Sequence, residues 1–263
     1  MEFTVDKSSP IPLYHQLAEQ LRSYIASGVL APGEKLPSEI SISEQIGISR
    51  MTVRQAIASL VREGLLEVRQ GLGTFVAQPK FLYDATRLFG FSEEMERLGI
   101  RVTSRILQQG IVSPPSGVMK ALCLSPEEQA FHVMRVRFAD EQPLLIETNY
   151  VPVRLCPGIE RYDFEHSSLY HCLQVDYGIR LAYARHTLEA VAATAEEANL
   201  LGVAAGSPLM LNRGVTFSDE EKPVEYFKVL YRGDRFRFEV ESRRVSLSQV
   251  LDSSRLNVFL GND

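Results

Sequence analysis

The stretch SRMTVRQAIASL, residues 49–60, places an apolar stripe behind a basic surface. Val53, Ile57 and Leu60 recur at the spacing of one helix face, so we expect them to pack inward. Residues 50–62 contain three arginines and no acidic residue. Local clustering of bases, rather than the net charge of a chain, decides whether a surface can bind a phosphate backbone. The stretch therefore predicts a surface helix that contacts nucleic acid.

The segments on either side of this helix predict a small domain around it. Apolar side chains repeat every four residues over 13–25, which indicates an amphipathic helix. Ser38 is placed to cap a short second helix that Gly47 ends, and Ser49 is placed to cap the next helix. The runs LLEV and TFVA, joined by RQGLG, predict a hairpin. This order of elements is that of a winged helix-turn-helix domain.

The helix that follows Ser49 is the candidate for reading DNA. In a helix-turn-helix the second helix of the pair enters the major groove with its N-terminal residues first. Arg50 and Arg54 can neutralise phosphates or reach guanine edges. Gln55 can bond adenine, and Thr52 can contact a phosphate or a thymine methyl group. Double-stranded DNA is therefore the predicted partner of residues 1–77.

The composition argues against several other classes of protein. The chain has 263 residues and a formal net charge of −5. Its longest apolar runs are too short to span a bilayer and no signal-peptide pattern opens it, so we expect a cytoplasmic protein without membrane contact. The three cysteines show no C-x-x-C spacing and the five histidines show no metal-ligand spacing. We therefore expect no disulfide scaffold, no metal site and no cofactor.

Residues 78–87 are expected to be a linker, and the pattern changes beyond them. The strand-like runs are 102–112, 130–139, 144–151, 182–192, 208–217, 224–231 and 236–245, and the helical patterns are 91–98, 115–123, 167–177 and 194–201. Two adjacent pairs of runs predict hairpins, across DEQP and across SDEEK. Hairpins interleaved with helices indicate an α+β domain with a mostly antiparallel sheet, which we place at residues 88–246. Residues 247–263 form a C-terminal tail to which the pattern assigns no structure.

Charged side chains lie inside apolar strands of this second domain. Arg135 and Arg137 share one strand face, and two buried guanidiniums require anionic partners. Glu147 and Glu225 lie in equally apolar strands, and Tyr231 has the same parity as Glu225. One interpretation is two structural ion pairs, Arg135–Glu147 and Arg137–Glu225. The other is a pocket in which the arginines bind a phosphate or carboxylate and the glutamates accept hydroxyl hydrogens. Periodicity alone leaves both interpretations open.

Eight motifs, in this order and spacing, resemble a known family. PIPLYHQL, APGEKLPSE, ISRMTVRQAIASLVREGLL and GLGTFV resemble the winged-helix domain of the GntR family of bacterial transcription regulators. RVRFADEQPLLIETNYVP, SSLYHCL, ATAEEANLLGVAAGSPLM and VEYFKVLYRGDRFRF resemble the effector-binding UTRA domain of its HutC subfamily, which has a chorismate-lyase-like fold. The resemblance covers residues 8–245. It implies a homodimeric repressor whose second domain binds a small metabolite.

The resemblance also assigns residues to the two sites. Members that bind phosphorylated amino sugars hold the phosphate at the segment before the first UTRA helix, at the arginine pair and at the serine–tyrosine segment. The effector site implied in this chain is Gly90, Phe91, Ser92, Arg135, Arg137, Glu147, Ser168, Tyr170, Glu225 and Tyr231, of which Glu147, Glu225 and Tyr231 match the positions that hold the sugar. The DNA-contacting set is Ser38, Arg50, Thr52, Arg54, Gln55, Arg69, Gly71, Gly73 and Thr74.

Three residues depart from the family pattern. Ile40 follows Pro-Ser-Glu directly, where the family has an arginine that contacts DNA. Leu72 stands at the wing tip, where a basic residue is common, and Arg69 is expected to compensate in part. A lost guanine contact costs on the order of 1–3 kcal/mol of discrimination, so the operator sequence should differ from those of close relatives. Gly90 stands where a hydroxyl residue is common, and we expect it to offer its amide to the anion.

Together these patterns predict a repressor whose affinity for its operator changes when a small anionic metabolite binds. A phosphorylated amino sugar or a sugar phosphate fits the pattern best. One alternative is a chorismate-lyase-like enzyme with a DNA-binding head, in which Glu147 or Glu225 is a general acid or base. Another is a DNA-binding protein with a degenerate pocket. No nucleophile–base pair is evident in the sequence, which favours a regulator over an enzyme.

Overall fold

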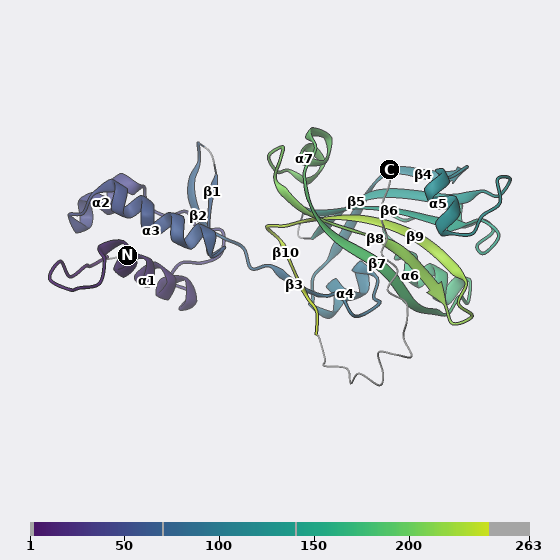
Figure 1. Ribbon diagram of the computed structural model, residues 1–263, viewed down its shortest axis with the longest axis horizontal. Coiled ribbons are helices and arrows are strands. Elements are labelled where there is room, and N and C mark those ends of the chain that lie inside the picture. The colour runs from purple at the N-terminus through teal and green to yellow at the C-terminus, as the bar shows by residue number, and fades with distance from the viewer. Residues whose placement is uncertain (1–2, 70, 140, 242–263) are drawn as a thin grey trace, which may run out of the picture.

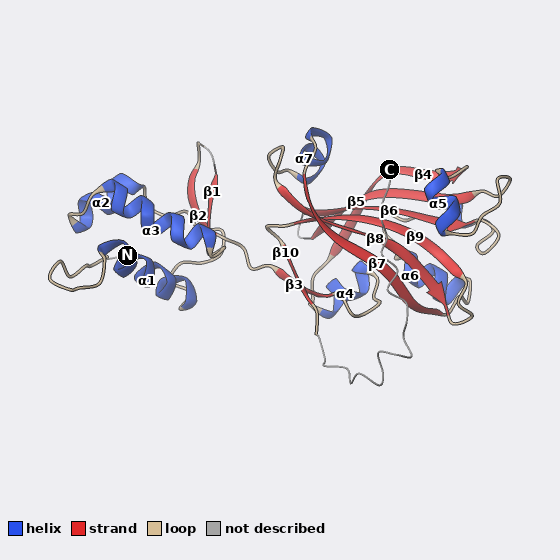
Figure 2. Cartoon of the chain, in the orientation of Figure 1, coloured by secondary structure: helices blue, strands red, loops and turns tan. Residues whose placement is uncertain are grey.

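The computed structural model describes residues 3–69, 71–139 and 141–241. Helices and one hairpin form the N-terminal part, at the left of Figure 1, and strands with short helices form the rest (Figure 2). The N-terminal elements are α1 (Leu13–Ala26), α2 (Glu39–Ile46), α3 (Arg50–Arg62), β1 (Leu66–Arg69) and β2 (Gly73–Val76).

Local capping sets the limits of α2 and α3. The Ser38 hydroxyl accepts a hydrogen bond from the Ser41 amide at 3.1 Å, and the Ser49 hydroxyl accepts one from the Thr52 amide at 3.1 Å. Each bond satisfies an amide that has no partner inside the helix. Gly47 ends α2 at a φ of 62°, in the left-handed region that glycine enters without steric cost. The predicted caps and the predicted helix end are confirmed.

One apolar core joins the three helices to the hairpin. Leu17, Leu21, Ile42, Val53 and Leu60 are completely buried in it. The inward stripe predicted for α3 is therefore confirmed. β1 and β2 pair antiparallel and form the wing. The N-terminal part is the winged helix-turn-helix that the sequence predicts.

Six antiparallel strands form the sheet of the C-terminal part, in the order β4-β5-β6-β9-β8-β7. Their bounds are β4 (Val102–Val112), β5 (Ala130–Ala139), β6 (Gln142–Pro152), β7 (Leu181–Ala192), β8 (Pro208–Ser218) and β9 (Pro223–Arg232). The pairs β5–β6 and β8–β9 are the two predicted hairpins. The expected α+β class with a mostly antiparallel sheet is confirmed.

The segment expected to be a linker contains a short strand. β3 (Phe81–Asp84) pairs parallel with β10 (Phe236–Glu239), whose paired residues lie more than 150 positions away. The ring centroids of Phe81 and Phe236 are 5.5 Å apart, and those of Tyr83 and Phe238 are 5.4 Å apart. The sequence pattern did not predict this strand, because aromatic burial against a distant strand stabilises the pairing. β10 ends at Glu239. Residues 242–263, including the predicted tail, lie outside the described residues.

Short helices cover both faces of the sheet. Their bounds are α4 (Phe91–Arg97), α5 (Ser116–Ala121), η1 (Ile159–Arg161), α6 (Leu169–His171), η2 (Cys172–Asp176) and α7 (Ala195–Leu201). α7 begins with the predicted capping box and packs on the face that carries Val136, Ile146 and Leu230. On the opposite face, α4 packs with β3 and β10, and α6 packs with the segment that precedes it. The helix predicted over 167–177 is divided into α6 and the π-helical turn η2.

None of the helices within the described ranges is long and apolar enough to cross a membrane.

Candidate functional site

The exposed face of α3 carries most of the predicted DNA-reading side chains. Arg50, Arg54 and Gln55 are exposed at the start of the helix. Thr52 is half-buried, and its hydroxyl lies 2.8 Å from the Ser49 hydroxyl, so it also takes part in the helix cap. The predicted side chains from the first turns of α3 are thus presented together, with Thr52 set back from the others.

An acidic residue from α2 holds one of these bases. The Arg54 guanidinium donates to the Glu39 carboxylate, with Nη2 to Oε2 at 2.8 Å. This hydrogen bond lowers the pKa of Glu39 below its usual range, although partial burial opposes the shift. Both side chains are solvent-accessible, so water screens their attraction and the pair adds little to stability. The pair therefore orients Arg54 while leaving it available to a phosphate or a base edge.

The wing presents a further base, Arg69, among its described residues. Arg69 donates to Glu67 and its guanidinium lies 4.3 Å from the centre of the Phe75 ring. Gly71 and Gly73 have φ angles of 74° and 121°, which the tight turn at the wing tip requires. Thr74 is half-buried in β2, whereas Ser38 is exposed and caps α2.

Lys35 is a basic residue of this surface that sequence reasoning missed. It pairs with Phe75 through an isolated bridge, and a Cβ placed on Gly73 would lie 2.9 Å from its Cε. Its exposed amine therefore stands beside the wing. Lys35 lies far from the wing in sequence, so no local pattern could place it there.

The inner face of the sheet encloses a cavity of about 220 Å³. All ten predicted effector residues line it, namely Gly90, Phe91, Ser92, Arg135, Arg137, Glu147, Ser168, Tyr170, Glu225 and Tyr231. They come from the N-terminus of α4, from β5, β6 and β9, and from α6 with the residue before it. The fold therefore gathers at one place side chains that are spread over more than 140 positions.

One carboxylate serves both buried arginines. Oε2 of Glu147 accepts from Arg135 Nε at 2.9 Å and from Arg137 Nη1 at 3.0 Å. Burial alone would raise the pKa of Glu147, but the two guanidiniums outweigh it and lower the pKa to about 2. The interpretation as two separate ion pairs is correct for Arg135–Glu147 and wrong for Arg137–Glu225. Two cations facing one anion leave this part of the cavity with a net positive charge.

The two arginines differ in their remaining contacts. Arg135 donates through Nη1 to the carbonyl oxygens of Phe164 at 3.0 Å and Ser167 at 3.2 Å, so it ties the segment before α6 to the sheet. Arg137 donates to the Ser92 hydroxyl at 2.6 Å, and its buried Nε has no hydrogen-bond partner. Burial and the charge of Arg135 lower the pKa of Arg137 to about 10. A buried donor left unpaired is costly, and a ligand oxygen would satisfy it.

The far end of the cavity holds an acid without a cationic partner. Glu225 accepts from Asn149 Nδ2 at 2.7 Å and from the Thr216 hydroxyl at 2.9 Å. Burial raises its pKa to about 7, although the Thr216 hydrogen bond opposes this shift. The Tyr170 hydroxyl lies 3.0 Å from Thr216 Oγ1. This end can therefore exchange hydrogen bonds with hydroxyl or amide groups.

At the rim of the cavity, the structure contradicts the expectation that the Gly90 amide is offered to an anion. The Gly90 amide donates to the Glu93 carboxylate at 3.2 Å, so it is not free for an anion. The lack of a side chain at Gly90 has a different reason, because a Cβ there would lie 3.3 Å from Tyr170 Cβ. The Ser168 hydroxyl caps α6 through the His171 amide at 3.3 Å.

Several cavity residues were missed by sequence reasoning. Tyr83 enters from β3, Asn149 from β6, and His186 and Asn212 from β7 and β8. His186 Nδ1 and Asn212 Oδ1 are 2.7 Å apart. Asn149 could have been found, because it lies two residues after Glu147 and so shares its strand face.

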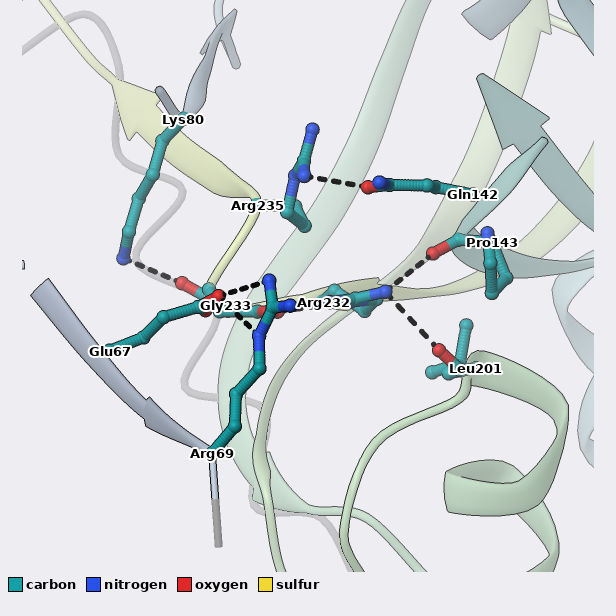
Figure 3. A network of polar contacts seen from close by, with 10 residues as sticks. Glu67, Arg69, Lys80, Gln142, Pro143, Leu201, Arg232, Gly233 and Arg235 are labelled. Carbon is teal, nitrogen blue, oxygen red and sulfur yellow. Dashed lines mark hydrogen bonds and ion pairs between the residues drawn. The ribbon is translucent and has the colours of Figure 1, made fainter. Parts of the chain in front are cut away.

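The wall formed by β3 also connects the cavity with the wing. Lys80 Nζ donates to the Gly233 carbonyl at 2.7 Å (Figure 3). Nearby, Arg235 donates to the Gln142 side chain at 2.9 Å. Lys80, which lies between the wing and β3, is therefore tied to the turn between β9 and β10.

Within the described residues, one cluster of three side chains could hold a metal ion. One ligand atom each from Asp163, Glu165 and His166 lies within 4.8 Å of the others, and all three side chains are exposed.

Two family models match the chain. The UTRA domain matches residues 97–237, and the family described as bacterial regulatory proteins, gntR family, matches residues 13–76.

Individual relatives match nearly the whole chain. The HTH-type transcriptional repressor NagR of Bacillus subtilis (strain 168) is 38% identical over 234 residues, which cover 89% of this chain and 96% of that protein. The histidine utilization repressor of Pseudomonas aeruginosa is 33% identical over 233 residues, which cover 88% and 91% of the two chains. The crystal structure of PhnF from Mycobacterium smegmatis is similar with a TM-score of 0.61 and 25% identity, covering 88% of this chain and 99% of that chain.

Proposed function

Because the chain belongs to the GntR family of bacterial regulatory proteins and carries a UTRA domain, we propose that it is a ligand-responsive transcriptional repressor. Residues 1–77 bind the DNA operator, residues 88–246 bind the effector, and residues 78–87 join the two. The curated names of two relatives, NagR and the histidine utilization repressor, support repression as the direction of control.

The observation that carries the effector proposal is the shared carboxylate. Glu147 neutralises one of two buried arginines, and Arg137 has an unpaired Nε beside the cavity. An anionic group supplies both the missing charge and the missing acceptor. The hydroxyl and amide groups around Glu225 suit a polyhydroxylated body, so a phosphorylated amino sugar or another sugar phosphate fits both ends.

The proposed mechanism uses two copies of the chain. A homodimer places its two α3 helices in successive major grooves, about 34 Å apart. Effector binding at Tyr83 and its neighbours moves β3, and with it the segment that leads to the wing. A coupling of about 1–3 kcal/mol would change operator affinity about 5–150-fold.

The test first measures which compounds bind the protein and then measures whether they change its affinity for DNA. A thermal-shift series on the full chain uses glucosamine 6-phosphate, glucose 6-phosphate, urocanate and inorganic phosphate. A compound that binds the folded state raises the melting temperature by mass action. A gel shift at fixed salt then measures whether the same compound changes affinity for a duplex selected from a random library. A change of at least fivefold supports the proposal, and unchanged affinity with every binding compound contradicts it.

Two alternatives give different results in the same series. Glu225, with a pKa near neutral, has a property that general acid–base catalysts need. Chromatography of the incubated compounds would reveal turnover, which favours an enzyme. Failure of every compound to raise the melting temperature favours a DNA-binding protein with a degenerate pocket.

A further inference from the structure

Large apolar side chains are exposed at the N-terminal turns of α2 and α3. Ile40 is 46% exposed and Met51 is 67% exposed. Single exposed apolar residues are common on protein surfaces. These two differ because each lies within the first turn of a helix in the helix-turn-helix pair, on the side of the domain that carries its exposed arginines.

The geometry places both side chains beside the polar reading residues. Met51, Arg54 and Gln55 are exposed and lie three and four positions apart, so they share one face of α3. The ion pair between Arg54 and Glu39 brings the first turn of α2 against this face, and Ile40 follows Glu39 directly. The first turns of α2 and α3 therefore expose both cationic and apolar side chains.

Resting on the proposed binding of DNA by residues 1–77, we infer that Ile40 and Met51 are specificity-determining residues that contact thymine methyl groups in the major groove. Thymine is the only base that presents a methyl group there, and an apolar side chain distinguishes it by contact rather than by hydrogen bonding. Ile40 has no donor for guanine O6 or N7. A base pair that faces it is read only if it carries an apolar group.

The surrounding charges identify duplex DNA as the occupant of this surface. Arg50 and Arg54 are exposed on the same first turns of α3 as Met51 and match a phosphate backbone in sign. Arg62 continues the exposed basic face at the end of α3. A purely apolar partner would not compensate the charges of Arg50 and Arg62, whereas Arg54 is already paired with Glu39.

Replacement of thymine by deoxyuridine tests the inference without disturbing hydrogen bonding, because it removes only the methyl group. A duplex is first selected from a random library with the full chain. Each thymine of that duplex is then replaced in turn, and dissociation constants are measured by fluorescence anisotropy at one salt concentration. We expect loss of a contacted methyl to weaken binding about fourfold, the equivalent of about 0.8 kcal/mol for one buried apolar carbon.

Alanine variants assign each sensitive thymine to a side chain. Ile40→Ala and Met51→Ala should each bind the parent duplex several-fold more weakly and each become insensitive to one of the deoxyuridine replacements. Val29→Ala is the matched control, because Val29 is 55% exposed but follows α1. It should retain the wild-type pattern. Since all three side chains are exposed, circular dichroism and melting temperatures should match the wild type.

Selection of a duplex from the same random library with the Ile40→Arg variant gives a second readout. An arginine pairs with guanine O6 and N7, so the selected consensus should exchange a thymine for a guanine at one position of each half-site. Sensitivity of less than twofold at every thymine, or a wild-type pattern in both alanine variants, overturns the inference while DNA binding stands. Failure of the library to yield any enriched sequence contradicts the proposed function as well.

Discussion

Replacement of Arg137 by methionine separates a structural role of this cation from a ligand-binding role. Burial, followed by the charge of Arg135, lowers the pKa of Arg137 from 12.5 to about 10. At roughly 1.4 kcal/mol per pKa unit, the folded protein disfavours this charge by about 3 kcal/mol. Because Arg137 stays protonated at neutral pH, the penalty is present in full below about pH 10 and fades only as pH rises from there towards 12.5. Methionine is unbranched, flexible and uncharged, and its side chain ends about where the guanidinium group of arginine begins.

Removal of one partner from an ordinary buried ion pair lowers the free energy of unfolding. We do not expect such a loss for Arg137→Met in the unliganded protein. Glu147 keeps its bond to Arg135 in the variant. We expect the free energy of unfolding to stay the same or to rise by up to about 3 kcal/mol. Urea unfolding without ligand measures this change. The anionic compound that stabilises the wild type should lose about 1.5–3 kcal/mol of binding energy, typical of a hydrogen bond to a charged group.

Arg213→Met is the matched control variant for this test. Arg213→Met removes an exposed arginine that pairs with Glu189 at 2.8 Å, and it should change stability by less than about 1 kcal/mol. If Arg137→Met instead destabilises the protein by about 3–5 kcal/mol, as removal of a partner from a structural buried pair does, the reasoning is refuted. Retention of full ligand stabilisation in the variant would refute the assignment of Arg137 to the anion.

Three other predictions concern the remaining parts of the chain. The pKa of Glu225 is raised to about 7, so the folded state binds the extra proton and stability should fall as pH rises from about 4.5 to 7; urea unfolding should show this slope in the wild type and not in Glu225→Gln. Thr194→Ala removes the hydroxyl that caps α7 and should cost about 1 kcal/mol, measured by thermal unfolding, whereas an unchanged melting temperature would mean that the cap contributes nothing. Leu72→Lys should strengthen binding to random-sequence duplex and steepen the dependence of log K on log salt by about 0.9 if the wing reaches a phosphate, and an unchanged slope would place the wing tip away from DNA.

The sequence predicts best what depends on neighbouring residues. Ser38, Ser49 and Thr194 each cap a helix within three positions, so the pattern contains the whole interaction. Strand parity likewise assigns Arg135 and Arg137 to one face of β5, and Glu225 and Tyr231 to one face of β9, because side chains alternate whatever the strand pairs with. The hairpins follow from short turns between apolar runs. These local rules account for most elements of both parts of the chain.

The sequence predicts least well what depends on the order of strands. β6 lies between β5 and β9, so Glu147 stands directly opposite Arg135 while Glu225 is separated from Arg137 by a whole strand. Parity could not distinguish these positions, and for this reason one of the two interpretations left open paired Arg137 with Glu225, which the structure contradicts. β3 was missed because its four residues are stabilised by a strand near the other end of the described chain.

The pairing of β3 with β10 determines where the effector-binding part can be cut from the chain. A fragment that begins at residue 88 would lack Tyr83, which forms part of the cavity wall, and would expose the hydrogen-bonding edge of β10. Unpaired strand edges promote association between molecules. An expression fragment for crystallisation or calorimetry should therefore start at or before Lys80, so that it contains β3 paired with β10.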